Sequence, residues 1–242
     1  MNYEKLQRII SEEDAVELEK YNNKSNSKYH LHREIGPCPF EGNLDEVRVV
    51  LLLANPSYAP PTECSISHSL EDDHERKIWQ SGWGIFSLHE DANPAMRDWW
   101  RANLKALQID TGLSWKIISN RIAALQINPW ASELFDSGCS KLPSINGTMR
   151  AIAKEFIQKE DLIFVICRRE KQWTQILNDA GNKNEKFRLN SLRRAYITSG
   201  NLSRSSGAYE KIVKRLKALA HNSEKSKPSI TSRVMEVASL MA

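Results

Sequence analysis

Residues 46–60 read EVRVVLLLANPSYAP, and this stretch decides the fold class. Apolar residues run without a break through 49–54, and the run ends at once in the polar corner NPSY. A strand that is apolar along its whole length is typical of a parallel sheet covered on both faces. We therefore predict a central strand over 47–54 that ends in a turn stiffened by Pro56.

Strands and helices are expected to alternate along the rest of the chain, which predicts an α/β fold with three layers (α/β/α) around a four-stranded parallel sheet. The other predicted strands are 122–128, 162–168 and 194–199, and the predicted helices are 95–108, 146–159, 171–181 and 206–220. This domain spans 46–220. Residues 1–45 form an N-terminal helical extension and linker, expected outside the main core, and residues 221–242 form a C-terminal tail.

Composition limits the classes of protein to which this chain can belong. The chain has 242 residues, with 34 Lys and Arg against 30 Asp and Glu, which makes the net charge +4. No apolar run approaches the roughly 18 residues of a membrane span, and the N-terminus is too charged for a signal peptide. The four cysteines (Cys38, Cys64, Cys139 and Cys167) form no Cys-x-x-Cys pair, so neither a zinc site nor a disulfide framework is indicated. We expect a cytoplasmic monomer that binds neither membrane nor metal.

Candidate functional residues follow the predicted strands, because ligands of open parallel sheets bind beyond the carboxyl ends of the strands. Each of the first two strands ends in an Asn-Pro dipeptide. Either dipeptide alone is ordinary turn chemistry, but two of them, each ending an apolar strand, favour a site. The four corners are Asn55 to Tyr58, Asn128 to Trp130, Arg168 to Glu170, and Thr198 to Arg204.

Four segments in this order resemble motifs of the uracil-DNA glycosylase superfamily, most of all its mismatch-specific and single-strand-selective branches. LANPSY (53–58) is similar to the first motif, Gly-x-Asn-Pro-Gly, and TSGNLS (198–203) to the last, Asn-Pro-Ser-Gly-Leu-Ser or His-Pro-Ser-Pro-Leu-Ser. SGWGIFSL (81–88) resembles the segment that carries a base-stacking Phe, and LQINPW (125–130) the strand that ends in a base-reading Asn. The similarity spans about residues 47–220.

The resemblance implies a monofunctional DNA glycosylase, which flips a base out of DNA, hydrolyses its N-glycosidic bond and leaves an abasic site without a cofactor. Asn55 would be catalytic and orient a water with its side-chain carbonyl. Phe86 would stack on the base, although it could equally share a buried face with Trp83. The implied base-binding residues are Ser57, Tyr58, Phe86, Asn128 and Thr198, and the implied DNA-binding residues are Ser199, Gly200, Asn201, Leu202 (as a wedge in the base stack), Ser203 and Arg204.

A basic segment supports DNA as the partner. Ten Lys and Arg residues lie between Lys183 and Lys217, against two Glu residues. A polyanion would use such a cluster, although the lysines of 211–217 fit an ordinary solvated helix face. Arg193, Arg194 and Arg204 are the stronger DNA-binding candidates.

Departures from the family pattern bear on the substrate. Thr198 stands where relatives carry His or Asn, Ser57 is small where uracil-restricted relatives carry Tyr, and the loop 59–80 is long. These features favour a modified, C5-substituted pyrimidine, such as a hypermodified phage base, and a role in anti-phage defence.

Other functions stay open. The chain could be a uracil or mismatch repair glycosylase, or a catalytically silent DNA-binding module of the same fold. An unrelated nucleotide-binding domain is the third alternative, but no glycine-rich phosphate motif follows any predicted strand.

Overall fold

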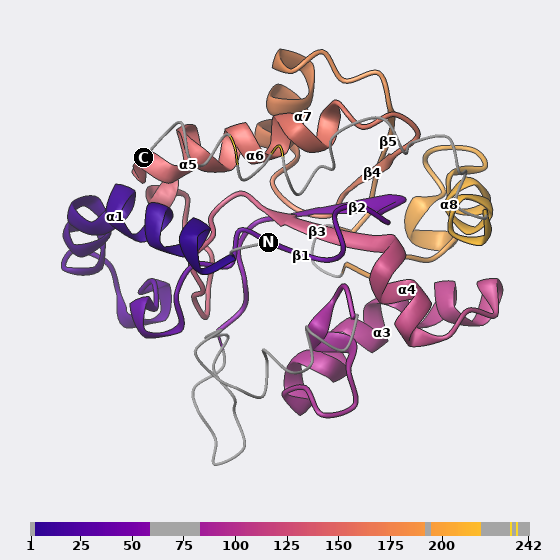
Figure 1. Ribbon diagram of the computed structural model, residues 1–242, viewed down its shortest axis with the longest axis horizontal. Coiled ribbons are helices and arrows are strands. Elements are labelled where there is room, and N and C mark those ends of the chain that lie inside the picture. The colour runs from indigo at the N-terminus through magenta and orange to yellow at the C-terminus, as the bar shows by residue number, and fades with distance from the viewer. Residues whose placement is uncertain (1–2, 59–82, 192–194, 219–232, 234–235, 237–242) are drawn as a thin grey trace.

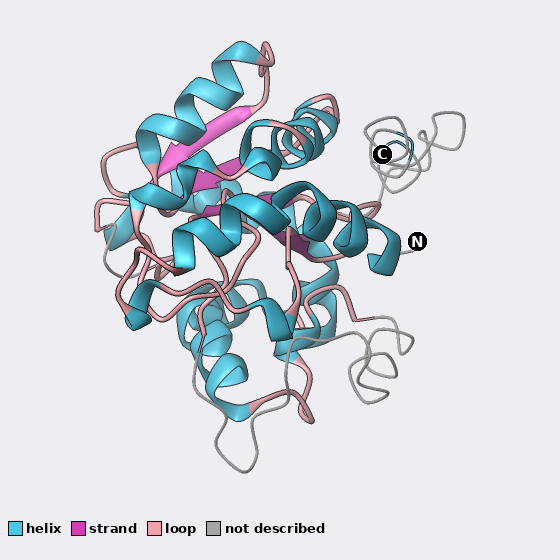
Figure 2. Cartoon of the chain, turned by 90° about the vertical axis from the view of Figure 1, so that its left-hand side faces the viewer, coloured by secondary structure: helices cyan, strands magenta, loops and turns pink. Residues whose placement is uncertain are grey.

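The computed structural model describes residues 3–58, 83–191, 195–218, 233 and 236, and in it a five-stranded sheet lies between two layers of helices (Figure 1). Helices α1 (Tyr3–Asn22), α5 (Pro143–Asn146), α6 (Thr148–Ile157) and α7 (Glu170–Asp179) cover one side, which we call the first face. Helices α3 (Pro94–Thr111), α4 (Trp115–Arg121) and α8 (Ala208–Lys217) cover the second face. Figure 2 shows the strands between these helices from the side. The predicted α/β class and three layers are confirmed.

The strand order is β1-β3-β2-β4-β5. Strands β2 (Val49–Leu53), β3 (Ile122–Gln126), β4 (Ile163–Ile166) and β5 (Glu185–Arg188) are parallel, and β1 (Phe40–Glu41) pairs antiparallel with β3. Every residue of β2, β3 and β4 is buried, as expected for strands covered on both faces. Residues 49–53 therefore form the central strand of the sheet.

Two predictions about the sheet are wrong. Among the described residues the sheet has five strands rather than four, and its fourth parallel strand is β5 (Glu185–Arg188) rather than 194–199. Ala195 and Ile197 are buried in the core, but the Ile197 N–H donates to the Asn103 carbonyl of α3 instead of to a strand. The alternation of these buried residues with exposed Tyr196 therefore reflects packing against the helices and not a strand. Strand β5 is an edge strand of mostly polar residues, so no apolar pattern in the sequence indicates it.

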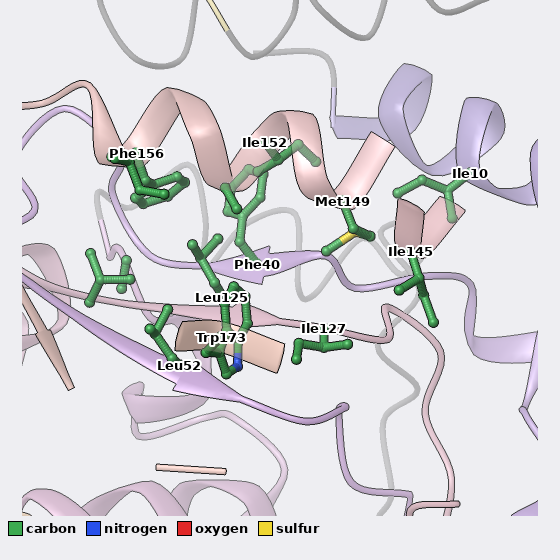
Figure 3. Packing of buried hydrophobic residues seen from close by; sticks show 14 of the residues in the cluster. Ile10, Phe40, Leu52, Leu125, Ile127, Ile145, Met149, Ile152, Phe156 and Trp173 are labelled. Carbon is green, nitrogen blue, oxygen red and sulfur yellow. The ribbon is translucent and has the colours of Figure 1, made fainter. Parts of the chain in front are cut away.

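The N-terminal helix is not outside the core, as the sequence analysis expected. Leu6, Ile9, Ile10 and Leu18 of α1 are buried in the core of the first face. Figure 3 shows Ile10 near Ile145 and Met149, to the right of the strand residues Phe40, Leu52 and Leu125, all in the core of the first face. The N-terminal segment also supplies strand β1, so it completes both the sheet and one helical layer.

A buried carboxylate fixes α1 against the rest of the protein. Asp14 accepts hydrogen bonds from Trp130 Nε1 at 2.7 Å, Ser144 N at 2.8 Å and Ser144 Oγ at 2.5 Å. Burial raises the pKa of this carboxyl, and the three donors act in the opposite direction. Trp130 belongs to the corner that follows β3, so α1 is tied directly to the edge of the sheet where the candidate site lies.

Helix α3 forms much of the second face, and its ends are set locally. The Asn93 side chain accepts from the N–H groups of Ala95 and Met96, and Pro94 begins the helix. Gly112 ends it at φ 68°, a left-handed conformation that glycine adopts without strain. Between these ends, α3 buries a row of large apolar residues against the sheet and α8, namely Trp100, Leu104 and Leu107.

Several sequence predictions concern residues outside the described ones: the loop 59–80, Cys64, Arg193, Arg194, and all of the tail 221–242 except Arg233 and Glu236. Cys38, Cys139 and Cys167 are buried free thiols. No helix within the described ranges is both long and apolar enough to cross a membrane.

Candidate functional site

The corners that follow β2 and β3 run side by side beyond the strands. Asn128 N donates to Ala54 O at 2.8 Å, Ser132 N to Pro56 O at 3.3 Å, and Tyr58 N to Ser132 O at 3.1 Å. The pairing of β2 with β3 thus continues through both Asn-Pro dipeptides. The two corners form one connected unit at the carboxyl edge of the sheet, as the sequence analysis expected.

Asn55 is half-buried in this unit, and its amide orientation is set by its neighbours. Nδ2 donates to Ser132 Oγ and to Pro56 O, both at 2.8 Å. Ser132 Oγ in turn donates to Leu134 O at 2.9 Å, so its lone pairs are available to Asn55. Both amide hydrogens are therefore used, and Oδ1 accepts no hydrogen bond within the described residues. The arrangement presents one oriented carbonyl oxygen at the end of the central strand.

Tyr58 closes the same corner and packs on a residue that sequence reasoning missed. Its ring stacks on His32, with centroids 3.3 Å apart and planes 9° from parallel. His32 Nδ1 lies 2.6 Å from Glu34 Oε1, which fixes the imidazole. Desolvation raises the pKa of Tyr58, and the charges of Glu34 and Glu133 act in the same direction. Ser57, between this pair and Asn55, is exposed.

Asn128 does not present its amide as the sequence analysis expected. The side chain is fully buried, and Oδ1 accepts from Trp130 N at 3.0 Å, which closes the corner as an Asx turn. Nδ2 is buried without a hydrogen-bond partner among the described residues and lies against the Cys139 thiol, whose pKa burial raises to about 12. Asn128 shapes the corner, and it cannot meet a base unless this corner rearranges.

The last sequence motif also lies at the carboxyl edge, next to the end of β5. Asn190 N donates to Asn201 O at 2.7 Å, and Asn190 Nδ2 donates to Gly200 O and Ser203 Oγ, both at 2.8 Å. Thr198 Oγ1 accepts from Asn201 N at 3.2 Å. The segment 198–204 is thus a tied loop that starts from the same edge as the Asn55 corner.

Leu202 is not an exposed wedge. It is 1% exposed and belongs to the core of the second face, because the single turn Gly200–Leu202 carries its side chain inward. Ser199, Gly200, Ser203 and Arg204 are exposed on the same loop. Contact with DNA would therefore come from the polar side of this loop.

Phe86 lies in the short 3-10 helix η3 (Phe86–Leu88) and is 9% exposed. Trp83 packs against the core of the second face, whereas Phe86 is a member of neither core cluster. Two contacts hold this segment. Gly84 packs so closely on the Ser119 carbonyl that a Cβ there would lie 2.3 Å from the oxygen, and Ser87 N donates to Glu41 Oε1 at 2.8 Å. These contacts hold Phe86 in a fixed position beside the sheet.

A polar group that the sequence analysis missed lies beside η3. Glu41 of β1 and Gln126, the last residue of β3, are both buried. Burial raises the pKa of Glu41 to about 7, while the Ser87 N–H, the nearby Ser87 hydroxyl and the Trp100 side chain oppose this shift. No local sequence pattern predicts that Glu41 and Gln126 come close together, because they do so only when β1 pairs with β3.

The basic residues between Lys183 and Lys217 do not all lie at the same edge of the sheet. The Leu216 carbonyl, near the end of α8, accepts from Arg121, which directly precedes β3. The last turn of α8 therefore lies at the amino edge of the sheet, opposite the candidate site. Several basic residues are also used in ion pairs: Lys211 with Glu185, Arg188 with Glu170 at 2.8 Å, and Arg215 with Asp161 at 3.2 Å. Arg204 is exposed in the loop at the carboxyl edge.

The described residues contain no group of three or more His, Cys, Asp or Glu side chains that could hold a metal ion. Comparisons with protein-family models, with curated proteins and with solved structures found no match to this chain. The resemblance to the uracil-DNA glycosylase superfamily therefore remains a prediction from the motifs.

Proposed function

We propose that this protein is a monofunctional DNA glycosylase with a uracil-DNA glycosylase-like fold, which extrudes a base from DNA and hydrolyses its N-glycosidic bond. The observation that carries the proposal is the Asn55 amide. Both of its hydrogens are held by Ser132 Oγ and Pro56 O, so Oδ1 is oriented at the carboxyl end of the central strand. An oriented, half-buried acceptor of this kind can hold a water molecule in one place.

The chemistry follows from what an amide can do. Asn55 Oδ1 accepts a hydrogen bond from a water and directs its oxygen at the anomeric carbon of the extruded nucleotide. An amide does not take up the water's proton, so the bond to the base breaks first through an oxocarbenium-like transition state, and the base leaves with the bonding electron pair. The water then adds to the sugar cation, and its proton passes to the departed base or to solvent. Rate then depends on positioning and on electrostatic stabilisation of the departing base. We expect slow turnover that is limited by the leaving group.

We propose a C5-substituted pyrimidine as the substrate, as in hypermodified phage DNA, with a role in anti-phage defence. Two observations support a pocket that tolerates bulk. Ser57 is small and exposed beside the catalytic corner, and Thr198 offers only a hydroxyl where a larger cationic or amide side chain would fill space. Excision of plain uracil or of mismatched bases is the alternative substrate class.

The direct test uses single- and double-stranded oligonucleotides that carry uracil, a mismatch, 5-hydroxymethylcytosine or its glucosylated form, followed by alkali. Strand breaks at the modified position are expected with the wild-type protein. Asn55→Ala should lower the rate by about 100-fold or more, because it removes the group that positions water. Asn146→Ala, at an exposed asparagine of α5, is the matched control and should keep full activity. DNA binding without an abasic product from any base would overturn the proposal in favour of a silent binding module.

Salt dependence tests which surface meets DNA. Arg204→Ala should reduce the slope of log binding constant against log salt by about one, because one phosphate contact is lost. Lys217→Ala is the control, since Lys217 is exposed in the last turn of α8 at the opposite edge of the sheet. Equal effects of the two substitutions would show that DNA does not lie across the carboxyl edge.

A further inference from the structure

Three polar side chains are buried together on the second face, at the carboxyl end of β3. Glu41, Ser87 and Gln126 are 7%, 0% and 6% exposed. Glu41 pairs with Ala124, and Gln126 is two residues further along β3, so both side chains project from the same face as diagonal neighbours. Ser87 joins them through its N–H, which donates to Glu41 Oε1 at 2.8 Å.

This group contains polar atoms that nothing in the described structure satisfies. Gln126 Oε1 is buried and has no hydrogen-bond partner among the residues described, and Ser87 Oγ, beside the Glu41 carboxyl, makes no hydrogen bond of good geometry. Buried polar atoms in native proteins are almost always paired, and an unpaired one costs free energy. An amide oxygen is an acceptor only, so the missing partner must be a donor.

The unpaired amide is next to the proposed catalytic corner. Gln126 pairs in register with Leu53 of the central strand, and Asn55 lies two residues beyond Leu53. Ser87, which donates to Glu41, directly follows Phe86, the residue expected to stack on a base. Gln126 therefore lies one strand away from the corner that would position water, and its diagonal neighbour Glu41 is hydrogen-bonded to the segment that carries Phe86.

We propose that Gln126 reads the hydrogen-bonding edge of the extruded base, and that Asn128 does not. The inference rests on the proposed glycosylase function and names the residue that gives it specificity. A side-chain amide offers a donor beside an acceptor, which matches a pyrimidine edge. In a uracil-type base N3–H donates to Oε1 and O4 accepts, and in a cytosine-type base N4–H donates and N3 accepts.

Glu41 is a positioning residue in this scheme. It touches no base, but it holds Ser87 by the backbone N–H and thereby fixes η3 relative to β1. Its place on the short antiparallel strand explains why the N-terminal segment belongs to the domain. The position of η3 therefore depends on β1 as well as on β3.

The test compares Gln126→Leu, which keeps the approximate volume of the side chain, with Gln175→Ala at an exposed position of α7. With whichever DNA the wild type cleaves, we expect Gln126→Leu to lower kcat/KM by about 100-fold or more, because a site built to pair with a polar edge loses its partner. Its melting temperature should stay equal or rise, since an unsatisfied buried acceptor is removed. Gln175→Ala should match the wild type in both measurements.

A second measurement separates this inference from the function on which it rests. Free uracil, cytosine and 5-hydroxymethylcytosine are added to the wild-type, Asn55→Ala and Gln126→Leu proteins, and binding is followed by saturation-transfer NMR. Wild type and Asn55→Ala should bind, and the preferred base tells a uracil-type from a cytosine-type edge. Gln126→Leu should not bind.

The outcomes are distinct. Base binding that depends on Gln126, with no cleavage of any DNA, would contradict the glycosylase function and keep Gln126 as a base-reading residue. Cleavage that survives Gln126→Leu unchanged would refute the inference and leave the function standing. A fall in melting temperature of the Gln126→Leu protein, together with unchanged base binding, would make Gln126 a structural residue only.

Discussion

The buried Glu41 carboxyl predicts a specific dependence of stability on pH. Glu41 is on β1 and faces η3 and α3, where it accepts hydrogen bonds from Ser87 N at 2.8 Å and from the Trp100 side chain. Burial raises its pKa from 4.5 to about 7, because the charged form loses its solvation. The substitution Glu41→Gln keeps the size of the side chain and an acceptor for Ser87, and it removes the titration.

The sign and size follow from linkage between protonation and folding. The folded-state pKa lies above the unfolded one, so the stabilising contribution is full below pH 4.5 and is lost as the pH rises through about 7. Since each unit of pKa difference is worth about 1.4 kcal/mol, the loss is on the order of 3 kcal/mol across this range. Glu41→Gln should show no such loss.

Urea unfolding of both proteins from about pH 4 to about pH 8 measures the effect. The free energy of unfolding of the wild type, relative to Glu41→Gln, should fall by about 3 kcal/mol between pH 4.5 and 7. Glu133→Gln, at an exposed carboxylate, should leave the pH profile of the wild type unchanged. A difference between wild type and Glu41→Gln that is constant with pH would refute the reasoning, because it would mean that Glu41 titrates normally in the folded state.

Three further predictions concern the site and its supports. Ser132→Ala should lower the free energy of unfolding by about 1 kcal/mol, because the Asn55 amide loses its acceptor. In a double-mutant cycle with Asn55→Ala the two effects should be non-additive, and additive effects would mean that the hydrogen bond from Asn55 Nδ2 to Ser132 Oγ contributes nothing. Asp14→Ala should cost about 3 kcal/mol in urea unfolding, because three buried hydrogen bonds lose their acceptor, and a cost below about 1 kcal/mol would contradict this. Gly42→Ala should lower the melting temperature strongly, since φ is 133° and a Cβ would lie 2.6 Å from a side-chain carbon of β3, whereas Gly200→Ala, which meets nothing within 4 Å, should change it little.

Much of the fold could be predicted from local pattern. The largely apolar runs at 49–54, 122–128 and 162–168 mark β2, β3 and β4, because a strand covered on both faces is apolar at nearly every position, and the buried Gln126 at the end of β3 is the exception. Strand β5 could not be found in this way. It is an edge strand with two exposed and two half-buried residues, so its pairing with β4 leaves no trace in hydropathy.

The candidate site, like the fold, could be predicted from the sequence only in part. Asn55 could be located from sequence, since it ends an apolar strand and precedes a proline. Asn128 occupies an equivalent place in its own strand, yet its amide is turned inward by the corner around Trp130. Leu202 likewise fits a family motif but fills the core of the second face. Motif position does not decide side-chain exposure, because exposure depends on what packs against the motif.

The sequence by itself determined the layered α/β architecture, the central strand and the edge of the sheet at which a site would lie. These features depend on single segments, because the side chains that a helix or strand buries determine the hydropathy pattern of that segment. The tertiary structure decided which side chains meet there. Ser132 fixes the Asn55 amide, His32 covers Tyr58, and Glu41 accepts a hydrogen bond from Ser87 N. Each of these contacts joins residues far apart in the chain, and their free energy is gained only when the sheet and its two helical layers have closed.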